Sequence, residues 1–228
     1  RGQPWVRMKM AASLDGTTAL ENGVSQWITG EAARADGHAW RARACAVLTG
    51  VGTVLEDDPM LDVRLVAASR QPHLVIVDSR LETPLSARLF QAPAGGLTRQ
   101  ILIYCADPDP ARQEALEALG AKVISLPGPG GKVDLAEMMR DLARHEVNEL
   151  HVEAGHKLNG SLLREGLMDE VLFYMAPKLL GTGAGMFNLG PLERLEDGTE
   201  LDFHDVTRVG SDLRVTARVR GRDHFLHA

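Results

Sequence analysis

The chain has 228 residues and a formal net charge of −6, with 44% hydrophobic and 25% charged residues. Its mass of 24.7 kDa suits one large α/β domain or two small ones, and without an apolar run of about 20 residues it has no candidate membrane span. The pI near 5.8 argues against a general nucleic-acid binder, because contact with phosphate backbones needs a basic surface.

The N-terminus and the cysteines indicate a cytoplasmic protein. Residues 1–10 lack the apolar core and cleavage site of a secretory signal, and they begin without Met. Cys45 and Cys105 are too few for a disulfide framework. We expect both cysteines to be reduced core residues, and the chain to be a piece of a longer protein or a processed form.

The first part of the chain alternates strands with helices. Pro59 disfavours helix immediately before it, and β-branched apolar runs of four to six residues are typical of buried strands. In chain order we expect a strand at 6–13, a turn at 14–17, a loop at 23–29, a helix at 31–45, a strand at 46–50, a Gly-rich turn at 50–55 and strands at 73–77 and 100–105.

The second part continues the alternation. Asp109 and Asp134 are suitable N-caps, because their carboxylates accept the unpaired N–H groups of a helix start. We expect helices at 111–119, 135–145 and 161–165, strands at 123–126, 149–153 and 171–175, loops at 127–131 and 177–190, and a closing hairpin at 203–208 and 213–219. The pattern predicts a single α/β domain with a mostly parallel twisted central sheet, helices on both faces and an antiparallel C-terminal hairpin.

Residues 149–165 form the most informative stretch, because an apolar strand runs directly into a Gly-containing turn and a helix. The N–H groups and the dipole of such a helix start favour an anion. Glu153 would place a carboxylate beside this anion site. Strand-turn-helix units without a ligand are also common, so a purely structural turn is the alternative.

Two further strand ends carry groups suited to a phosphate. The turn at 50–55 resembles a dinucleotide fingerprint in its first two glycines, but Leu55 stands in place of the third, and a tight structural turn is the alternative. Ser79 and Arg80 offer a hydroxyl and a guanidinium, which favour the 2′-phosphate of NADP. For these residues the alternatives are an exposed loop arginine and a turn in which Asp78 is the acceptor.

Four more residues are candidates from their setting. Lys9 interrupts the apolar alternation of the first strand, and Asp57 could act as a general acid. Arg41 and Arg64 each follow an element that ends near the expected crevice, although ordinary surface charges are the favoured explanation when these residues are taken alone.

A zinc site is not expected. His151 and Glu153 match the H-x-E element of zinc deaminases, but no cysteine follows Cys105 to complete such a site. We interpret His151 as a packed or hydrogen-bonded strand residue and expect no metal.

Six ordered motifs together resemble the reductase domain of the bacterial riboflavin-biosynthesis deaminase/reductase. The resemblance extends over about residues 4–219, and the motifs lie at 9–16, 25–29, 52–59, 77–79, 152–155 and 176–181. It implies a dihydrofolate-reductase-like fold and an NADPH-dependent oxidoreductase. The implied reaction reduces 5-amino-6-(5-phosphoribosylamino)uracil to 5-amino-6-(5-phosphoribitylamino)uracil.

The resemblance also assigns residues to ligands. The substrate residues would be Ser25, Arg41, Leu61, Arg64 and Glu153. The NADPH residues would be Ala11, Trp27, Thr53, Asp57, Ser79 and the turn Gly155, His156, Lys157, Leu158, Asn159, Gly160 and Ser161, with Arg80 added from the phosphate argument above. Lys9 and Asp57 are the candidates for handling the proton that accompanies hydride transfer.

The family usually carries an N-terminal zinc deaminase domain, which this sequence lacks, so we expect either the C-terminal half of a multifunctional enzyme or a stand-alone reductase. The resemblance also suggests a homodimer. Two other functions remain: a pterin reductase of the same fold, as in dihydrofolate reduction, and a non-catalytic nucleotide-binding module. Arg41 and Arg64 favour a phosphorylated sugar over a pterin.

Overall fold

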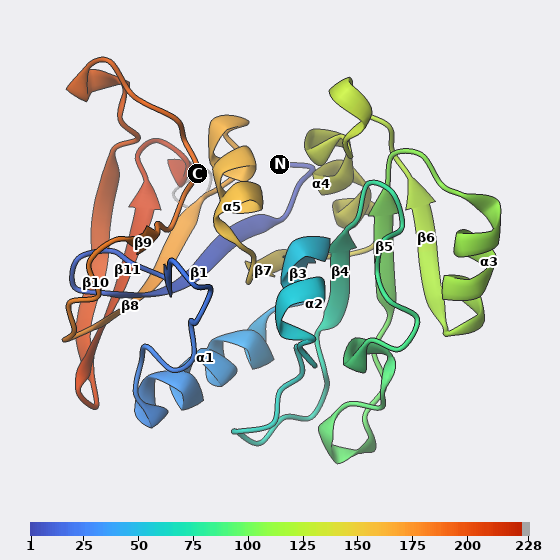
Figure 1. Cartoon of the computed structure of the whole chain (residues 1–228), viewed down its shortest axis with the longest axis horizontal. Helices are drawn as coiled ribbons and strands as arrows, with labels where there is room; N and C mark the ends of the chain where they lie inside the picture. The colour runs from blue at the N-terminus through green and yellow to red at the C-terminus, as the bar shows by residue number, and fades with distance from the viewer. Residues whose placement is uncertain (225–228) are drawn as a thin grey trace. The chain divides into compact units, whose positions relative to one another are not determined.

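The computed structural model describes residues 1–224, which form two compact units coloured along the chain in Figure 1. Unit 1 comprises Arg1, Trp5–Gly37 and the part of the chain from Gly155 onward, and unit 2 comprises Gly2–Pro4 and His38–Ala154. In the described part of the chain, no helix combines the length and the apolar character needed to cross a bilayer. The expectation of a single domain over residues 1–228 stays a prediction.

Unit 2 is built on five parallel strands in the order β7-β3-β4-β5-β6. Its strands are β3 (Ala46–Gly50), β4 (His73–Val77), β5 (Ile101–Cys105), β6 (Ala121–Ser125) and β7 (Glu149–Val152). Its helices are the second half of α1 (Glu31–Arg43), α2 (Val51–Asp57), α3 (Pro110–Ala118), α4 (Leu135–Arg144) and the short 3-10 turns η1 (Arg88–Phe90), η2 (Ala94–Gly96) and η3 (Pro129–Gly131).

Helices cover both faces of this sheet, as predicted. The chain passes from β3 to β6 in one direction, by way of α2 and α3, and returns through α4 to β7 on the other side of β3. Because such crossovers are right-handed, α4 lies on the opposite face from α2 and α3. Side-chain alternation along β5 agrees: Ile103 joins the core with Val54 of α2 and Leu116 of α3, whereas the neighbouring Tyr104 hydroxyl donates to Asp141 of α4 at 2.7 Å.

Unit 1 holds the predicted antiparallel C-terminal hairpin. Strand β1 pairs in parallel with β8, β8 pairs antiparallel with β11, and β11 forms a hairpin with β10. The elements of this unit are β1 (Trp5–Ser13), β2 (Ala19–Leu20), the first half of α1, α5 (His156–Arg164), β8 (Glu170–Ala176), β9 (Gly183–Ala184), η4 (Leu195–Asp197), β10 (Leu201–Val209) and β11 (Asp212–Val219). The short β2–β9 pair was not predicted: β9 lies within the expected loop at 177–190, and no element was assigned to the residues of β2. The pairing is parallel throughout unit 2 and mixed in unit 1, and this combination of strands with covering helices confirms the predicted α/β class.

The predicted helix caps are confirmed. Asp109 accepts the N–H of Arg112 at 2.8 Å, and Asp134 accepts the N–H of Glu137 at 2.8 Å. Each aspartate thereby satisfies one of the donors that a helix start leaves unpaired.

Two predicted Gly-rich turns are wrong, because they are the first turns of helices. Helix α2 begins at Val51, so that most of the expected turn at 50–55 is helical, and α5 begins at His156 rather than at Ser161. Gly50 and Gly155 are the N-cap residues, where glycine is tolerated. The sequence reading gave too much weight to the low helix propensity of glycine, which tertiary packing overrides.

Gly160, in the middle of α5, allows the helix to approach another segment of unit 1 closely. A β-carbon at this position would overlap the carbonyl oxygen of Asn188, which also accepts a hydrogen bond from Arg164. Asn188 in turn donates its N–H to the His156 carbonyl at 3.0 Å. Only glycine fits this contact without a shift of the backbone.

We expect Gly160→Ala to lower the free energy of unfolding by about 1–3 kcal/mol, because overpacking forces the backbone apart. Gly52→Ala is the matched control, since a β-carbon there meets nothing within 4 Å; it should be neutral or stabilise the protein by up to about 1 kcal/mol. Urea denaturation of both variants measures the difference. Equal stability of the two variants would contradict the close approach at Gly160.

Candidate functional site

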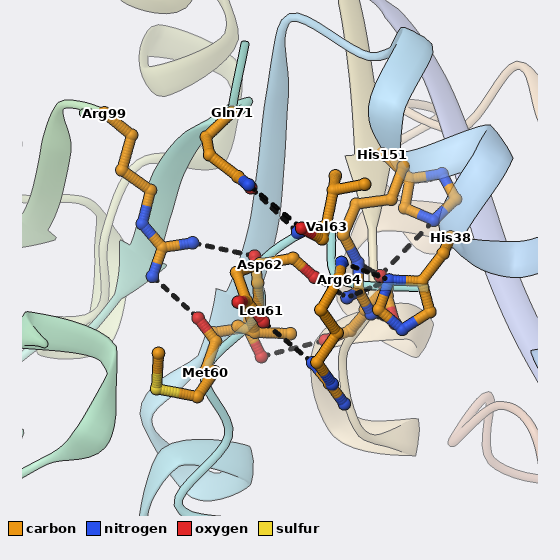
Figure 2. A network of polar contacts seen from close by, with 12 residues as sticks. His38, Met60, Leu61, Asp62, Val63, Arg64, Gln71, Arg99 and His151 are labelled. Atoms are coloured by element: carbon orange, nitrogen blue, oxygen red, sulfur yellow. Dashed lines mark hydrogen bonds and ion pairs between the residues drawn. The ribbon is translucent and has the colours of Figure 1, made fainter. Parts of the chain in front are cut away.

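Arg41, on the last turn of α1, contacts several members of a polar cluster of unit 2, and Figure 2 labels some of these members, among them His38 and Asp62. Its Nε and Nη2 donate to the two carboxylate oxygens of Glu153 at 2.7 and 3.0 Å, and its Nη1 donates to the Asp62 carbonyl at 2.5 Å. Burial alone would lower the pKa of Arg41. The charges of Glu153 and Asp62 raise it by more than burial lowers it, so the pKa of Arg41 lies above its ordinary value. Arg41 is therefore a permanent cation that is fully engaged by its neighbours.

Glu153 is fixed at the end of β7. Its N–H donates to the Leu48 carbonyl at 2.8 Å, and its own carbonyl accepts the Thr49 hydroxyl at 2.8 Å. The imidazole Nε2 of His151 lies 3.5 Å from one carboxylate oxygen, and His151 is completely buried. This confirms His151 as a packed strand residue, and it leaves Glu153 as a carboxylate whose position is set by a strand and by Arg41.

Arg64 is the exposed cation of the cluster. Its Nη1 donates to the Asp62 carboxylate at 2.8 Å, and 46% of the Arg64 side chain is exposed, against 3% for Asp62. A half-exposed guanidinium with one anchored edge still has donors available to a planar or tetrahedral anion. Arg64 is thus better placed than the buried Arg41 to bind a phosphate.

His38, one turn before Arg41 on α1, is neutral near pH 7. Burial, followed by the charges of Arg41 and Arg64, lowers the pKa of His38 to about 4. Its Nδ1 accepts the N–H of Arg64 at 3.3 Å and lies 3.4 Å from Arg41 Nη1. Two donors at Nδ1 require a lone pair there, so the ring proton is on Nε2.

The end of β4 combines a buried anchor with exposed residues. Asp78 is fully buried, and its carboxylate accepts the N–H groups of Glu82 and Thr83 and the Thr83 hydroxyl at 2.6–2.9 Å. This confirms the alternative that Asp78 is a turn acceptor. Ser79 is half-buried, and Arg80 is exposed, with its Nη2 3.7 Å from Glu82.

Helix α2 carries Thr53 and Asp57. Thr53 is half-buried in the first turns of the helix, and Asp57 is its last residue. Partial burial of the carboxyl group and the neighbouring Glu56 raise the pKa of Asp57. A raised pKa brings a carboxyl group closer to the range in which it can exchange a proton near neutral pH.

The candidates of unit 1 lie on β1 and on the loop before α1. Lys9 and Ala11 are both half-buried on β1, and Lys9 Cε lies 3.9 Å from where a β-carbon on Gly37 would be. Ser25 is half-buried, whereas 61% of Trp27 is exposed. The Arg34 guanidinium lies 4.7 Å from the Trp27 ring centroid, which gives this loop an exposed aromatic face with a nearby cation.

The predicted cofactor residues on helix α5 fall into two groups, those at the helix start and those buried further along it. Gly155 has no side chain to cap the helix, and the first helical bond runs from Asn159 N–H to the Gly155 carbonyl at 3.1 Å. The three preceding N–H groups therefore have no partner inside the helix. Asn159 and Gly160, however, are buried, and Asn159 Nδ2 donates to the Met186 carbonyl at 3.3 Å. Only the start of the helix is open to an anion.

Within unit 2 the structure brings together four of the five predicted substrate residues, namely Arg41, Leu61, Arg64 and Glu153. The Leu61 side chain belongs to the hydrophobic core and its carbonyl accepts a hydrogen bond from Arg99, and its assignment to the substrate stays a prediction. The sequence reading missed four polar members of the cluster, which are His38, Asp62, Gln71 and Arg99. A pair of polar residues directly before a strand, as at Arg99-Gln100, was the available signal.

Comparisons with known proteins give a consistent result. The family model described as the RibD C-terminal domain matches residues 4–215. The riboflavin biosynthesis protein RibD of Bacillus amyloliquefaciens is 36% identical over 218 residues, which are 95% of this chain and 57% of that protein.

Solved structures similar to this chain include those of two bacterial proteins. Acinetobacter baumannii RibD superposes with a TM-score of 0.80 at 34% identity, over 96% of this chain and 58% of that one. A Thermotoga maritima diaminohydroxyphosphoribosylaminopyrimidine deaminase/5-amino-6-(5-phosphoribosylamino)uracil reductase superposes with a TM-score of 0.75 at 26% identity, over 95% and 57%. The chain thus spans somewhat more than half the length of each of these relatives.

The low pKa of His38 predicts a pH dependence of stability. The folded-state pKa, about 4, lies below the ordinary histidine value of 6.5, so the unfolded chain takes up the proton first as the pH falls. The contribution of His38 is fully present above pH 6.5 and is lost as the pH falls towards 4. Denaturant titrations at several pH values measure it.

His38→Asn is the control, because it keeps an acceptor near the position of Nδ1 and removes the titration. The variant should show a shallower loss of stability between pH 6.5 and 4 than the wild type. The comparison is needed because burial also lowers the pKa of His73. Identical slopes for the two proteins would show that His38 is not held neutral by the fold.

Proposed function

The chain belongs to the RibD C-terminal domain family of riboflavin-biosynthesis reductases, and from this premise we propose that it reduces 5-amino-6-(5-phosphoribosylamino)uracil with NADPH. The product is 5-amino-6-(5-phosphoribitylamino)uracil. The name of the Thermotoga maritima relative supports this choice of substrate.

The proposal rests on the difference in exposure and pairing between Arg41 and Arg64. Arg41 is neutralised by a two-point ion pair with Glu153, whereas Arg64 keeps an exposed guanidinium. A phosphate ester bound at Arg64 would form charge-assisted hydrogen bonds. Glu153 accepts two hydrogen bonds from Arg41, and the resemblance to the reductase family supports its assignment to the uracil end of the substrate.

Residues of each unit, taken separately, carry groups suited to one part of NADPH. The uncapped start of α5 at Gly155 offers N–H groups to a pyrophosphate, with His156, Lys157 and Leu158 as its first helical residues. Gly52, on α2, leaves space where a side chain would otherwise stand, beside Thr53. Ser79 and the exposed Arg80 suit a 2′-phosphate. When bound, NADPH supplies the hydride.

Two residues of the chain remain the candidates for the proton. Asp57, with its raised pKa, can hold a proton on its carboxyl group at a higher pH than an ordinary aspartate. Lys9 can hold one on Nζ. Ala11, Ser25 and Trp27 are assigned to binding in the same proposal, Ala11 and Trp27 to the cofactor and Ser25 to the substrate.

The proposal extends to the partners of the chain. A homodimer is expected, as is a cytoplasmic setting, and a covalently linked deaminase domain is expected where the full-length protein resembles its longer relatives.

Absorbance at 340 nm tests the function directly. NADPH should be consumed when 5-amino-6-(5-phosphoribosylamino)uracil is added, and mass spectrometry should show a product that has gained two hydrogens. Consumption with a dihydropterin instead would favour the pterin reductase. Binding of NADPH without consumption of either substrate would favour a non-catalytic nucleotide-binding module.

For Arg64→Ala we predict a rise in KM for the phosphorylated substrate of roughly 10- to 100-fold, because a hydrogen bond to a charged group contributes about 1.5–3 kcal/mol. The dephosphorylated substrate serves as the control, and its KM should not change on substitution. Steady-state kinetics at saturating NADPH measure both. If the two substrates lose affinity equally, the phosphate lies elsewhere.

Ser79→Asp tests the cofactor. The introduced carboxylate should repel the 2′-phosphate, so that the Kd for NADPH rises by about tenfold or more relative to that for NADH. Ser79→Asn, of similar size and without charge, is the matched control and should leave this ratio close to that of the wild type. Fluorescence titration gives both constants, and equal losses for NADPH and NADH in Ser79→Asp would refute the assignment.

A further inference from the structure

The segment Met60–Arg64, hereafter the 60–64 segment, has no regular secondary structure and yet is mostly buried. Residues 58–72, which connect α2 to β4, contain neither helix nor strand. Buried backbone N–H and C=O groups outside helices and sheets need side-chain or water partners. The question is therefore which side chains supply them.

All five residues of this segment form backbone hydrogen bonds with side chains from outside the segment, as Figure 2 shows for the labelled residues. Arg99 donates to the Met60 and Leu61 carbonyls at 2.6 and 2.7 Å. Gln71 accepts the Val63 N–H at 2.7 Å and donates to the Val63 carbonyl at 3.0 Å. Arg41 donates to the Asp62 carbonyl, and His38 accepts the Arg64 N–H, as described above.

Arg99 acts at the point of greatest backbone strain. Leu61 has a φ of +49°, in the left-handed region that a branched residue rarely adopts. Arg99 bonds the carbonyls of Leu61 and of the residue before it, and its Nη2 also reaches the Leu89 carbonyl of η1 at 3.1 Å. The guanidinium thus ties the strained residue to a separate element of the core, where the Leu61 side chain is also buried.

Arg99 stays charged in this position. Burial, with a smaller contribution from Arg41, lowers its pKa to about 10, and Asp62 opposes that shift. A pKa of 10 leaves the guanidinium fully protonated at neutral pH. Its three carbonyl contacts are therefore charge-assisted bonds, which are stronger than neutral ones.

The segment ends at the half-exposed Arg64. Asp62 links the backbone of the segment to the Arg64 side chain. Its carbonyl accepts a hydrogen bond from Arg41, and its carboxylate accepts one from Arg64 Nη1. If the backbone moved at Leu61, the adjacent Asp62 would move with it, and its carboxylate would then displace the half-exposed Arg64 guanidinium. The direction of Arg64 thus depends on contacts made three residues earlier in the chain.

We propose that Arg99 is a positioning residue for the anionic end of the substrate, because it holds the 60–64 segment in the one backbone conformation that presents Arg64 to a phosphate. This inference rests on the proposed function. Arg99 itself touches neither the phosphate nor the reacting atoms. Its loss changes the binding of the phosphate and leaves the chemical step intact.

Arg99→Gln, Arg99→Lys and a matched control, Arg112→Gln, test the proposal. Arg112 also donates to two loop carbonyls of unit 2, those of Leu81 and Thr83, but outside the 60–64 segment. At saturating NADPH, Arg99→Gln should raise KM by about tenfold and change kcat by less than about twofold, which corresponds to loss of one charge-assisted contact at Arg64. Arg99→Lys, which keeps a charged donor, should recover part of the affinity, and Arg112→Gln should leave KM unchanged.

Hydrogen exchange supplies a readout that does not depend on turnover. Amides of residues 61–64 should exchange faster in Arg99→Gln than in the wild type, and those of β3 should not. Faster exchange together with an unchanged KM would overturn the proposal, since Arg99 would then serve stability alone. An equal rise in KM for Arg112→Gln would overturn it as well.

A separate probe distinguishes this inference from the proposed function. If the wild type does not turn over the phosphoribosylaminouracil, the proposed function fails, and calorimetric titration with ribose 5-phosphate still tests the positioning of Arg64. Weaker binding of ribose 5-phosphate to Arg99→Gln than to Arg112→Gln would support the inference. Equal binding to both variants would refute it.

Discussion

The buried guanidinium of Arg41 is the interaction on which the polar cluster of unit 2 depends. With only 8% of the residue exposed, its charge would be costly without partners. Glu153 neutralises it through two parallel hydrogen bonds, and the Asp62 carbonyl takes a further donor. Removing one partner of such a buried pair typically lowers the free energy of unfolding by about 3–5 kcal/mol. Through these contacts the Arg41 side chain joins helix α1, the end of strand β7 and the 60–64 segment.

Much of the architecture follows from local sequence rules. Asp109 and Asp134 marked two helix starts, and the apolar runs marked the buried strands. The two helices whose starts were misplaced, α2 and α5, both follow glycine N-caps. Their formation depends on packing that no local rule encodes, as the approach of Gly160 to Asn188 shows. The short β2–β9 pair likewise joins segments more than 160 residues apart, beyond the range of periodicity.

The candidate site was predictable only in part. Arg41, Arg64 and Glu153 were named from motifs, but their arrangement was not, because an ion pair across 112 residues leaves no trace in spacing. Arg41 was expected among the substrate residues, which stays a prediction, and the structure shows that it is paired with Glu153. Gln71 had no sequence signature and Arg99 only its place directly before a strand, since both satisfy the backbone of a segment whose conformation the sequence does not reveal. The hydrogen-bond partners of buried polar groups are thus the part of the site that the sequence does not predict, because these partners lie far apart in the chain.

The central claim is that Arg64 receives the substrate phosphate while Arg41 remains paired with Glu153. Side-chain Nε–H resonances of ¹⁵N-arginine-labelled protein test it most directly, with Arg64→Lys and Arg41→Lys used for assignment. On addition of 5-amino-6-(5-phosphoribosylamino)uracil, the account predicts a shift of the Arg64 resonance and a much smaller one for Arg41. A large shift of Arg41 with none for Arg64 would contradict it.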